Sequence, residues 1–254
     1  MSKFHRGALL APVTAGLMLL GSLAQAEELS IATGGTGGVY YPYGGGLAEV
    51  IGRHVEGYTA SVEVTGASVE NVALIQRGDS DMALALADTV YAAFTGSGRY
   101  DGAAVTELRA LASIYPNAVQ LVTLADSGIT SLADLRGQAV SVGAPGSGTE
   151  VSAQMILAAN GITYDDFSPQ RLNFNETADA LRDGVIVAGF WSVGPPTSSI
   201  MNLAATRAIR IVPIGGDEAA AAIAVEPTFA PYTLRAGTYD GMTEGVATIS
   251  TPNV

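Results

Sequence analysis

The stretch IATGGTGGVYYPYGGG, residues 31–46, decides how the rest of the chain is interpreted. Seven of its sixteen residues are glycine and three are tyrosine. A strand-like segment, LSIAT (29–33), precedes its turn, and GLAEVIGRHVEG (46–57) follows with apolar residues at helical spacing. A strand, a glycine-rich turn and a helix in this order are typical of α/β proteins.

This stretch lacks residues that two common nucleotide-binding motifs require. The dinucleotide motif needs glycine at its first, third and sixth positions. Counted from Gly35 the sixth position is Tyr40, and counted from Gly34 the third is Thr36. The phosphate loop needs a lysine, and none follows Lys3. Two interpretations stay open: a structural turn with tyrosines in the core, or a turn whose glycines let a small ligand reach backbone N–H groups.

The composition narrows the chemistry that the chain can perform. It holds 24 acidic against 12 basic residues, a net charge of −12, and no cysteine. We therefore expect no nucleic-acid partner and no disulfide framework. Lysine is absent after Lys3, and the only histidine after His5 is His54. We expect no catalytic residues of the Cys–His or Schiff-base type, no metal site and no cofactor.

The N-terminus has the pattern of a secretory signal peptide. Lys3 and Arg6 precede an apolar segment at 8–23, and Ala24-Gln25-Ala26 offers small residues at a cleavage site. We expect residues 1–26 to be removed and the protein to reach the periplasm. Loss of the two basic residues would leave ten basic against 24 acidic residues, a net charge of −14.

A second glycine turn, SVGAPGSGTE (141–150), repeats the order of strand, turn and helix. Backbone N–H groups and hydroxyls at helix starts attract anions, so two such turns that face each other can hold a small carboxylate without an arginine. The alternation of strands and helices predicts lobe one at 27–120, lobe two at 121–245, and a crossover back to lobe one at 246–254. LRALASIY (108–115) and AVQLVTL (118–124) are predicted strands near the boundary.

Four segments together resemble one family. They are IATGGTGGVYYPYGGGLA (31–48), VEVTGASVENVALIQRGDSDMALALADTVYAAF (62–94), SLADLRGQAVSVGAPGSGTE (131–150) and GFWSVGPPTSSI (189–200). In this order they resemble the TAXI family, the solute-binding proteins of tripartite ATP-independent periplasmic (TRAP) transporters. The resemblance runs from about Leu29 to the last residue.

This resemblance implies an α/β, two-lobed periplasmic binding protein fold of type II-like arrangement, with the ligand cleft between the lobes. It implies a receptor without enzymatic activity that binds glutamate, glutamine, 2-oxoglutarate or a related dicarboxylate. The partner would be a TRAP membrane permease driven by a sodium gradient, and we expect the receptor to be a monomer.

The resemblance also implies which residues bind the ligand. Trp191 has an alternative interpretation as a core residue. The implied residues are Gly35, Thr36, Gly37 and Tyr40 in the first turn; Thr65, Ala87, Asp88 and Thr89 as second choices; and Ser147, Gly148, Thr149, Phe190, Trp191, Gly194 and Pro195 in lobe two.

Two expectations concern the end of the chain and the role of the receptor. TAXI proteins continue past the segment that VATISTPNV (246–254) resembles, so the C-terminal part of lobe one is expected to be missing. A periplasmic sensory receptor for the same ligands stays open as an alternative. An enzyme on the same fold also stays open, although the residue types disfavour it.

Overall fold

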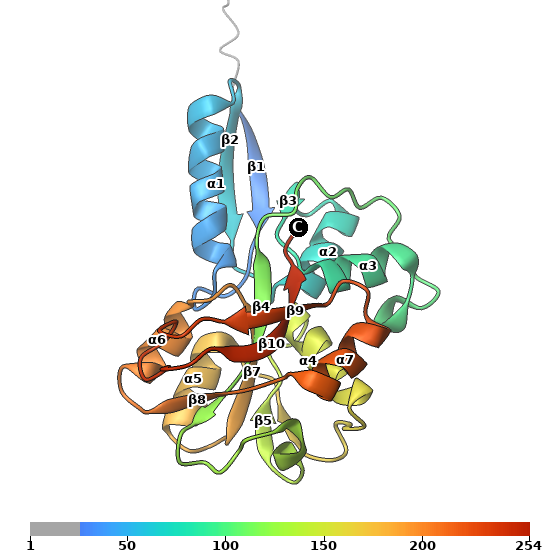
Figure 1. Ribbon diagram of the computed structural model, residues 1–254. Helices are drawn as coiled ribbons and strands as arrows, with labels where there is room; N and C mark the ends of the chain where they lie inside the picture. Colours follow the sequence, from blue (N-terminus) through green and yellow to red (C-terminus); the bar gives the residue numbers. More distant parts are fainter. Residues whose placement is uncertain (1–25) are drawn as a thin grey trace, which may run out of the picture.

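The computed structural model describes residues 26–254, arranged as two lobes that each contain one β-sheet (Figure 1). The predicted signal peptide therefore lies outside the described residues, apart from Ala26. Lobe one is built from residues 27–115, and lobe two from residues 116–252. Within the described part of the chain, no helix has both the length and the apolar character to cross a membrane.

Lobe one is a parallel α/β unit. Its sheet has the strand order β2-β1-β3, and each successive pair of strands is joined through a helix. Parallel strands require such crossovers. The elements are β1 (Glu27–Ala32), α1 (Tyr40–His54), β2 (Tyr58–Glu63), α2 (Ser68–Arg77), β3 (Met82–Ala83), α3 (Ala87–Thr95) and the 3₁₀ turn η1 (Gly98–Tyr100).

Lobe two holds a mixed sheet with the order β6-β5-β7-β4-β10-β9, and β8 also pairs with β4. Strands β5, β6 and β7 are parallel, whereas β4 is antiparallel to β7, β8 and β10. The elements are β4 (Pro116–Leu124), η2 (Leu132–Leu135), β5 (Ala139–Ser141), α4 (Gly148–Ala159), β6 (Ser168–Gln170), α5 (Phe174–Arg182), β7 (Ala188–Val193), α6 (Ser198–Ala204), β8 (Ile209–Val212), α7 (Gly216–Val225), β9 (Ala230–Leu234) and β10 (Val246–Pro252).

Helices cover both faces of the lobe-two sheet, so its central strand β7 is buried along its whole length. Phe190 on one face packs in a core with Ile156 and Leu157 of α4. Trp191 on the other face packs in a second core with residues of α5 and α6. Figure 1 shows α5 and α6 on one side of this sheet, and α4 and α7 on the other. Such burial on both faces explains the continuous apolar run of β7.

The chain crosses between the lobes at the start of β4 and again after β10. Asn253 joins the two crossings: its side-chain amide donates to Tyr115 O at 2.9 Å and to Asn117 Oδ1 at 2.7 Å. Val254 then exchanges two backbone hydrogen bonds with Ala85, both 2.9 Å long, in lobe one. The predicted boundary at residue 120 falls inside β4, whose pairing lies entirely in the second sheet.

Two sequence-based predictions of secondary structure are wrong. Helix α1 begins at Tyr40 rather than at residue 46, because Pro42 occupies the first helical turn, where a missing N–H group costs no hydrogen bond. The predicted strand at 108–115 is irregular, and Leu111 is 78% exposed. Among the N–H groups of this segment, only that of Ile114 donates to a backbone acceptor within the described residues, Asn253 O. An apolar pattern forms a strand only where a partner strand is available.

The glycines of α1 generate a stability prediction. A β-carbon at Gly44 would lie 2.6 Å from Thr33 Cγ2, whereas one at Gly46 would have no neighbour within 4 Å. We expect Gly44→Ala to lower the free energy of unfolding by about 1–2 kcal/mol, because overpacking outweighs the gain in helix propensity. Gly46→Ala should raise it by up to about 1 kcal/mol. Denaturant unfolding measures both, and a destabilising Gly46→Ala would contradict this packing.

Candidate functional site

A cavity of about 350 Å³ lies between the lobes, where the helix starts of both lobes meet. Small-molecule sites in proteins occupy about 300–1,000 Å³, and they often lie between domains. Lobe one contributes Gly34, Gly35, Gly38, Val39, Tyr40, Val64, Thr65, Gly66, Ala67, Ser68 and Leu86; lobe two contributes Asn117, Ala144, Pro145, Ser147, Gly148, Thr149, Asn173, Phe174, Ser192 and Val193.

Three hydroxyls gather at one corner of this cavity, at the start of α4. Ser147 is the N-cap of the helix, and its Oγ accepts the N–H of Glu150 at 3.1 Å. Thr149 Oγ1 accepts the N–H of Ser192 at 3.3 Å, which brings the end of β7 to the same corner. Ser192 is 5% exposed, and its Oγ has no hydrogen-bond partner among the described residues. We call Ser147, Gly148, Thr149 and Ser192 the donor corner.

Backbone N–H groups add to the donor corner. The N–H groups of Gly148 and Thr149 have no protein acceptor within residues 26–254, as expected for the first turn of a helix. The aligned peptide dipoles of α4 place positive potential at this same end. A buried hydroxyl without a partner, two free N–H groups and a helix start are the kinds of donor that bind anionic groups in proteins.

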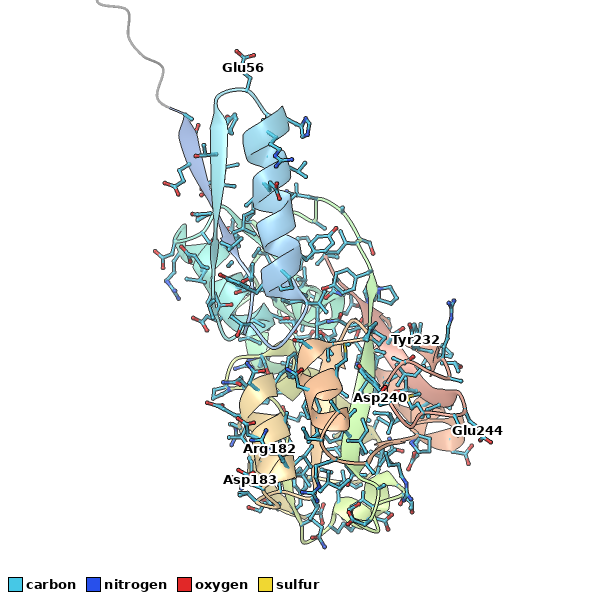
Figure 2. All side chains as sticks on the ribbon, turned by 90° about the vertical axis from the view of Figure 1, so that its left-hand side faces the viewer. Glu56, Arg182, Asp183, Tyr232, Asp240 and Glu244 are labelled. Carbon is cyan, nitrogen blue, oxygen red and sulfur yellow. The ribbon has the colours of Figure 1, made fainter. Side chains whose placement is uncertain are left out.

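The rest of the cavity is mostly apolar and carries no charge. None of its lining residues, all of which lie in the described part of the chain, is Asp, Glu, Lys, Arg or His. Figure 2 shows Glu56, Arg182, Asp183 and Glu244 on the outer surface, pointing away from the junction of the lobes. The electrostatics of the cavity therefore come from helix ends and hydroxyl groups, with no ion pair. The larger apolar side chains are Val39, Val64, Leu86, Phe174 and Val193, and Ala67, Ala144 and Pro145 add smaller ones.

Tyr40 links the cavity wall to the crossings between the lobes. Its ring lines the cavity, and its hydroxyl donates to Asn253 Oδ1 at 2.5 Å. Burial raises the pKa of Tyr40 well above its ordinary value, and the neighbouring Tyr115 adds to this shift. The hydroxyl therefore stays protonated and keeps donating to Asn253.

Hydrogen bonds across the cleft hold the lobes together around the cavity. The carbonyl of Gly146 accepts the N–H groups of Val69 and Glu70, at 3.1 and 3.2 Å. The carbonyl of Gly37 accepts the hydroxyls of Thr197 and Ser198, at 3.0 and 3.3 Å. The first set joins the start of α2 to the loop before α4, and the second joins the first glycine turn to the start of α6. The structure therefore has the lobes in contact, with the cavity between them.

The structure brings six of the fifteen predicted site residues together on the cavity wall and places nine elsewhere. Thr36 is exposed, and Gly37 contacts lobe two through its carbonyl. The six are Gly35, Tyr40, Thr65, Ser147, Gly148 and Thr149, and the nine are Thr36, Gly37, Ala87, Asp88, Thr89, Phe190, Trp191, Gly194 and Pro195.

Phe190 and Trp191 lie in the cores of lobe two rather than on the cavity wall. Both are fully buried, and Trp191 Nε1 donates to Ser199 Oγ at 3.1 Å. Trp191 stacks on Phe174 with ring centroids 6.0 Å apart, and Phe174 lines the cavity. The tryptophan therefore lies one layer behind the wall. The residues of β7 that line the cavity are the next two, Ser192 and Val193.

Ala87, Asp88 and Thr89 begin helix α3, behind the cavity. Asp88 is fully buried, and its Oδ2 accepts the hydroxyl of Ser152 in α4 at 2.6 Å, so this contact also joins the lobes. Thr89 donates its N–H and its hydroxyl to Asp88 Oδ1. Burial raises the pKa of Asp88 to about 6, and this outweighs the opposing hydrogen bonds; the charge of Glu226 also raises it.

Gly194 and Pro195 follow β7 just outside the cavity. A β-carbon at Gly194 would lie 2.8 Å from Tyr115 Cε2, so this glycine allows the first crossing segment to pass closely.

Sequence reasoning missed several lining residues, among them Ser192, Asn173 and Phe174. Asn173 and Glu176 form a capping box at the start of α5, and the sequence NFNE contains that signal. No local pattern identifies Ser192, because its place depends on how far β7 extends beside β4. Within residues 26–254, no group of three potential metal-ligating side chains is found.

Comparison with known proteins agrees with this architecture. The profile of the NMT1-like family matches residues 31–254. Among solved structures, the alkanesulfonate-binding protein of Xanthomonas axonopodis pv. citri bound to MOPS is 16% identical with a TM-score of 0.54, covering 89% of this chain and 66% of that one. A protein from Bordetella bronchiseptica RB50 is 18% identical with a TM-score of 0.56, covering 90% and 64%.

The protein Tv2483 bound to L-arginine is 15% identical with a TM-score of 0.51, covering 89% of this chain and 78% of that one. These likenesses confirm the predicted α/β fold of a type II-like periplasmic binding protein. The chain spans about two thirds of the length of the Xanthomonas and Bordetella proteins.

The buried carboxyl of Asp88 generates a prediction about pH. An unfolded aspartate has a pKa of about 3.9, whereas burial raises that of Asp88 to about 6. The folded state therefore binds the proton more tightly, and ionisation destabilises it as the pH rises from about 4 to 6. Asp88→Asn cannot ionise, so its stability relative to the parent should increase by about 2–3 kcal/mol over that range and then stay constant.

Denaturant unfolding between pH 4 and pH 7 measures this difference, with Asp81→Asn as the control. Asp81 is exposed, and hydrogen bonds from Ser30 lower its pKa, so its ionised form stabilises the fold. The control should therefore lose stability relative to the parent as the pH rises through about 4. If both variants show the same trend, Asp88 is not ionising in a buried site.

Proposed function

The chain belongs to the NMT1-like family, and on that premise we propose that it is an extracytoplasmic solute-binding protein that takes up a small organic acid between its lobes. The donor corner is the observation that carries this proposal, because a buried Ser192 hydroxyl without a partner lies beside two free N–H groups at the start of α4. These donors suit a carboxylate. We propose no catalytic role, since the lining described above contains no acid, histidine or lysine side chain.

We further propose that the protein delivers its ligand to a sodium-driven TRAP permease, as a member of the TAXI group of receptors. The resemblance of the segments at 31–48 and 131–150 to that group supports this assignment. Both segments supply residues of the cavity. Export to the periplasm, cleavage after about Ala26 and a monomeric state belong to the same proposal. Glutamate, glutamine and 2-oxoglutarate are the first ligands that the resemblance suggests.

The genes beside the one for this protein test the delivery step. A neighbouring gene for a membrane protein with many spans would support transport. A neighbouring histidine kinase without such a gene would favour the sensory alternative.

Ligand binding is tested by thermal unfolding with a panel of small mono- and dicarboxylic acids, including their 2-oxo and 2-amino forms. A ligand at about 100 times its dissociation constant adds about 2.7 kcal/mol to stability, which raises the melting temperature measurably. We expect at least one acid to do so and to change the fluorescence of Trp191, the only tryptophan, through its stacking on Phe174. If no organic acid shifts the melting temperature, the proposed function is wrong.

Gly148→Ala tests whether the ligand binds where the lobes meet. A β-carbon at Gly148 would lie 2.5 Å from Ser68 Oγ and 2.6 Å from Leu86 Cδ1, both in lobe one. We expect the variant to hold the lobes apart, to lower the melting temperature without ligand as overpacking does at Gly44, and to weaken ligand binding at least tenfold. Gly45→Ala, with no neighbour within 4 Å, is the matched control and should bind normally. Unchanged affinity in Gly148→Ala would place the ligand elsewhere.

A further inference from the structure

We infer that the cavity selects an organic acid that has one anionic group, an apolar body and no ammonium group, such as a branched-chain 2-oxo acid. This inference rests on the proposed binding function and specifies the ligand class within it. It differs from the amino-acid and dicarboxylate ligands that the sequence resemblance suggests.

The donor corner combines hydroxyl hydrogens with two N–H groups at the positive end of α4. Ser147 and Thr149 each accept a backbone N–H, and neither hydroxyl donates to another atom of the described residues. Their hydrogens, that of Ser192 and the N–H groups of Gly148 and Thr149 therefore have no acceptor among the described residues. A carboxylate contributes only acceptors, whereas an ammonium group contributes only donors. The two N–H groups and the positive potential of the helix start therefore favour the carboxylate and disfavour the ammonium group.

An amino acid would place its ammonium group in apolar surroundings. That group is attached to the carbon next to the carboxylate, so it would lie just beyond the donor corner. Leu86 packs close to Gly148, and Val193 directly follows Ser192. Two acids close to this region, Glu70 and Asp88, lie outside the lining, and their carboxylates already accept hydrogen bonds from Gly66 and from Ser152 and Thr89. A buried ammonium group without a carboxylate partner is strongly disfavoured.

A second carboxylate is disfavoured at the start of α2. That helix begins on the opposite side of the cleft, and two N–H groups of its first turn are already used, whereas that of Ser68 is not used within the described residues. The carbonyl of Gly146 accepts those of Val69 and Glu70, and the carboxylate of Glu70 takes the N–H of Gly66 just before the helix. The negative charge of Glu70 would also repel another anion there. No arginine or lysine lines the cavity in the described chain to compensate.

The remaining wall suits an apolar body. Five of the apolar side chains that line it are larger than alanine or proline and come from both lobes, and the volume of about 350 Å³ lies at the lower end for small-molecule sites. A short branched hydrocarbon chain removes this surface from water without requiring further polar partners. The five are Val39, Val64, Leu86, Phe174 and Val193.

Calorimetric titration of the purified protein with four acids tests the inference. The acids are 4-methyl-2-oxopentanoate, L-leucine with the same carbon skeleton, 2-oxoglutarate and L-glutamate. We expect the first to bind at least about tenfold more tightly than each of the others. If L-leucine or 2-oxoglutarate binds as tightly or more tightly, the inference is wrong while the proposed function stands. If none of the four and no other acid of the panel binds, both are wrong.

Ser192→Ala tests whether the anionic group of the ligand binds at the donor corner. Because the hydroxyl has no protein partner, its removal should leave the melting temperature unchanged or raised. Affinity for 4-methyl-2-oxopentanoate should fall about tenfold, as for loss of one hydrogen bond to a charged group. Ser168→Ala, at the exposed first residue of β6, is the control and should change neither property. Unchanged affinity in Ser192→Ala would overturn the assignment of the carboxylate to this corner.

Discussion

The hydrogen bonds of Asn253 hold the two crossings of the chain together, and the position of the cavity depends on them. One fully buried side chain donates to Tyr115 O and to Asn117 Oδ1 while it accepts from Tyr40. Asn253 thus joins the segment that precedes β4 to the segment that follows β10. Loss of any of these bonds would leave a buried polar group without a partner, which costs about 1–3 kcal/mol. The lobes are thus joined where every polar atom of the Asn253 side chain is hydrogen-bonded, and one wall of the cavity, Tyr40, is bonded directly to that side chain.

A strongly acidic chain binds an anion only if local fields outweigh its net charge. The chain carries −12, but the charged side chains lie outside the cavity, and salt screens charges over about 10 Å. The start of α4 and Ser192 lie on the cavity wall, so they would act on a bound anion at hydrogen-bond distance. Their effect is therefore stronger than that of distant carboxylates.

The sequence predicts features that depend on neighbouring residues and misses those that depend on tertiary pairing. The second glycine turn and the capped start of α4 follow from the local residues Ser147 to Thr149, and the structure places all three on the cavity wall. In β7 the predicted residues were Phe190 and Trp191, but Ser192 and Val193 line the cavity. Which end of that strand reaches the cleft depends on its register with β4, where Val119 lies opposite Ser192. No local pattern encodes that register.

Segment 108–115 also shows that local sequence does not determine tertiary pairing: a strand is predicted there, and none forms. Its apolar pattern is that of a strand, yet the chain there is irregular. The apolar pattern indicates only that the side chains of this segment can be buried. Whether a strand forms depends on a partner edge, which the residues of that segment do not determine.

Several glycines at the cleft are needed because the lobes approach closely there, and not because the backbone conformation requires glycine. Gly37, Gly66 and Gly148 all lack the positive φ that would require glycine. A β-carbon at each would nevertheless lie within 3 Å of an atom in the other lobe: Asn175 Oδ1 for Gly37, Pro145 O for Gly66 and Ser68 Oγ for Gly148. Gly35 is different, since a β-carbon there would meet nothing within 4 Å, and it lines the cavity. The glycine-rich stretch therefore contains both kinds of position: Gly37 lets the lobes touch, and Gly35 leaves room for the ligand that they enclose.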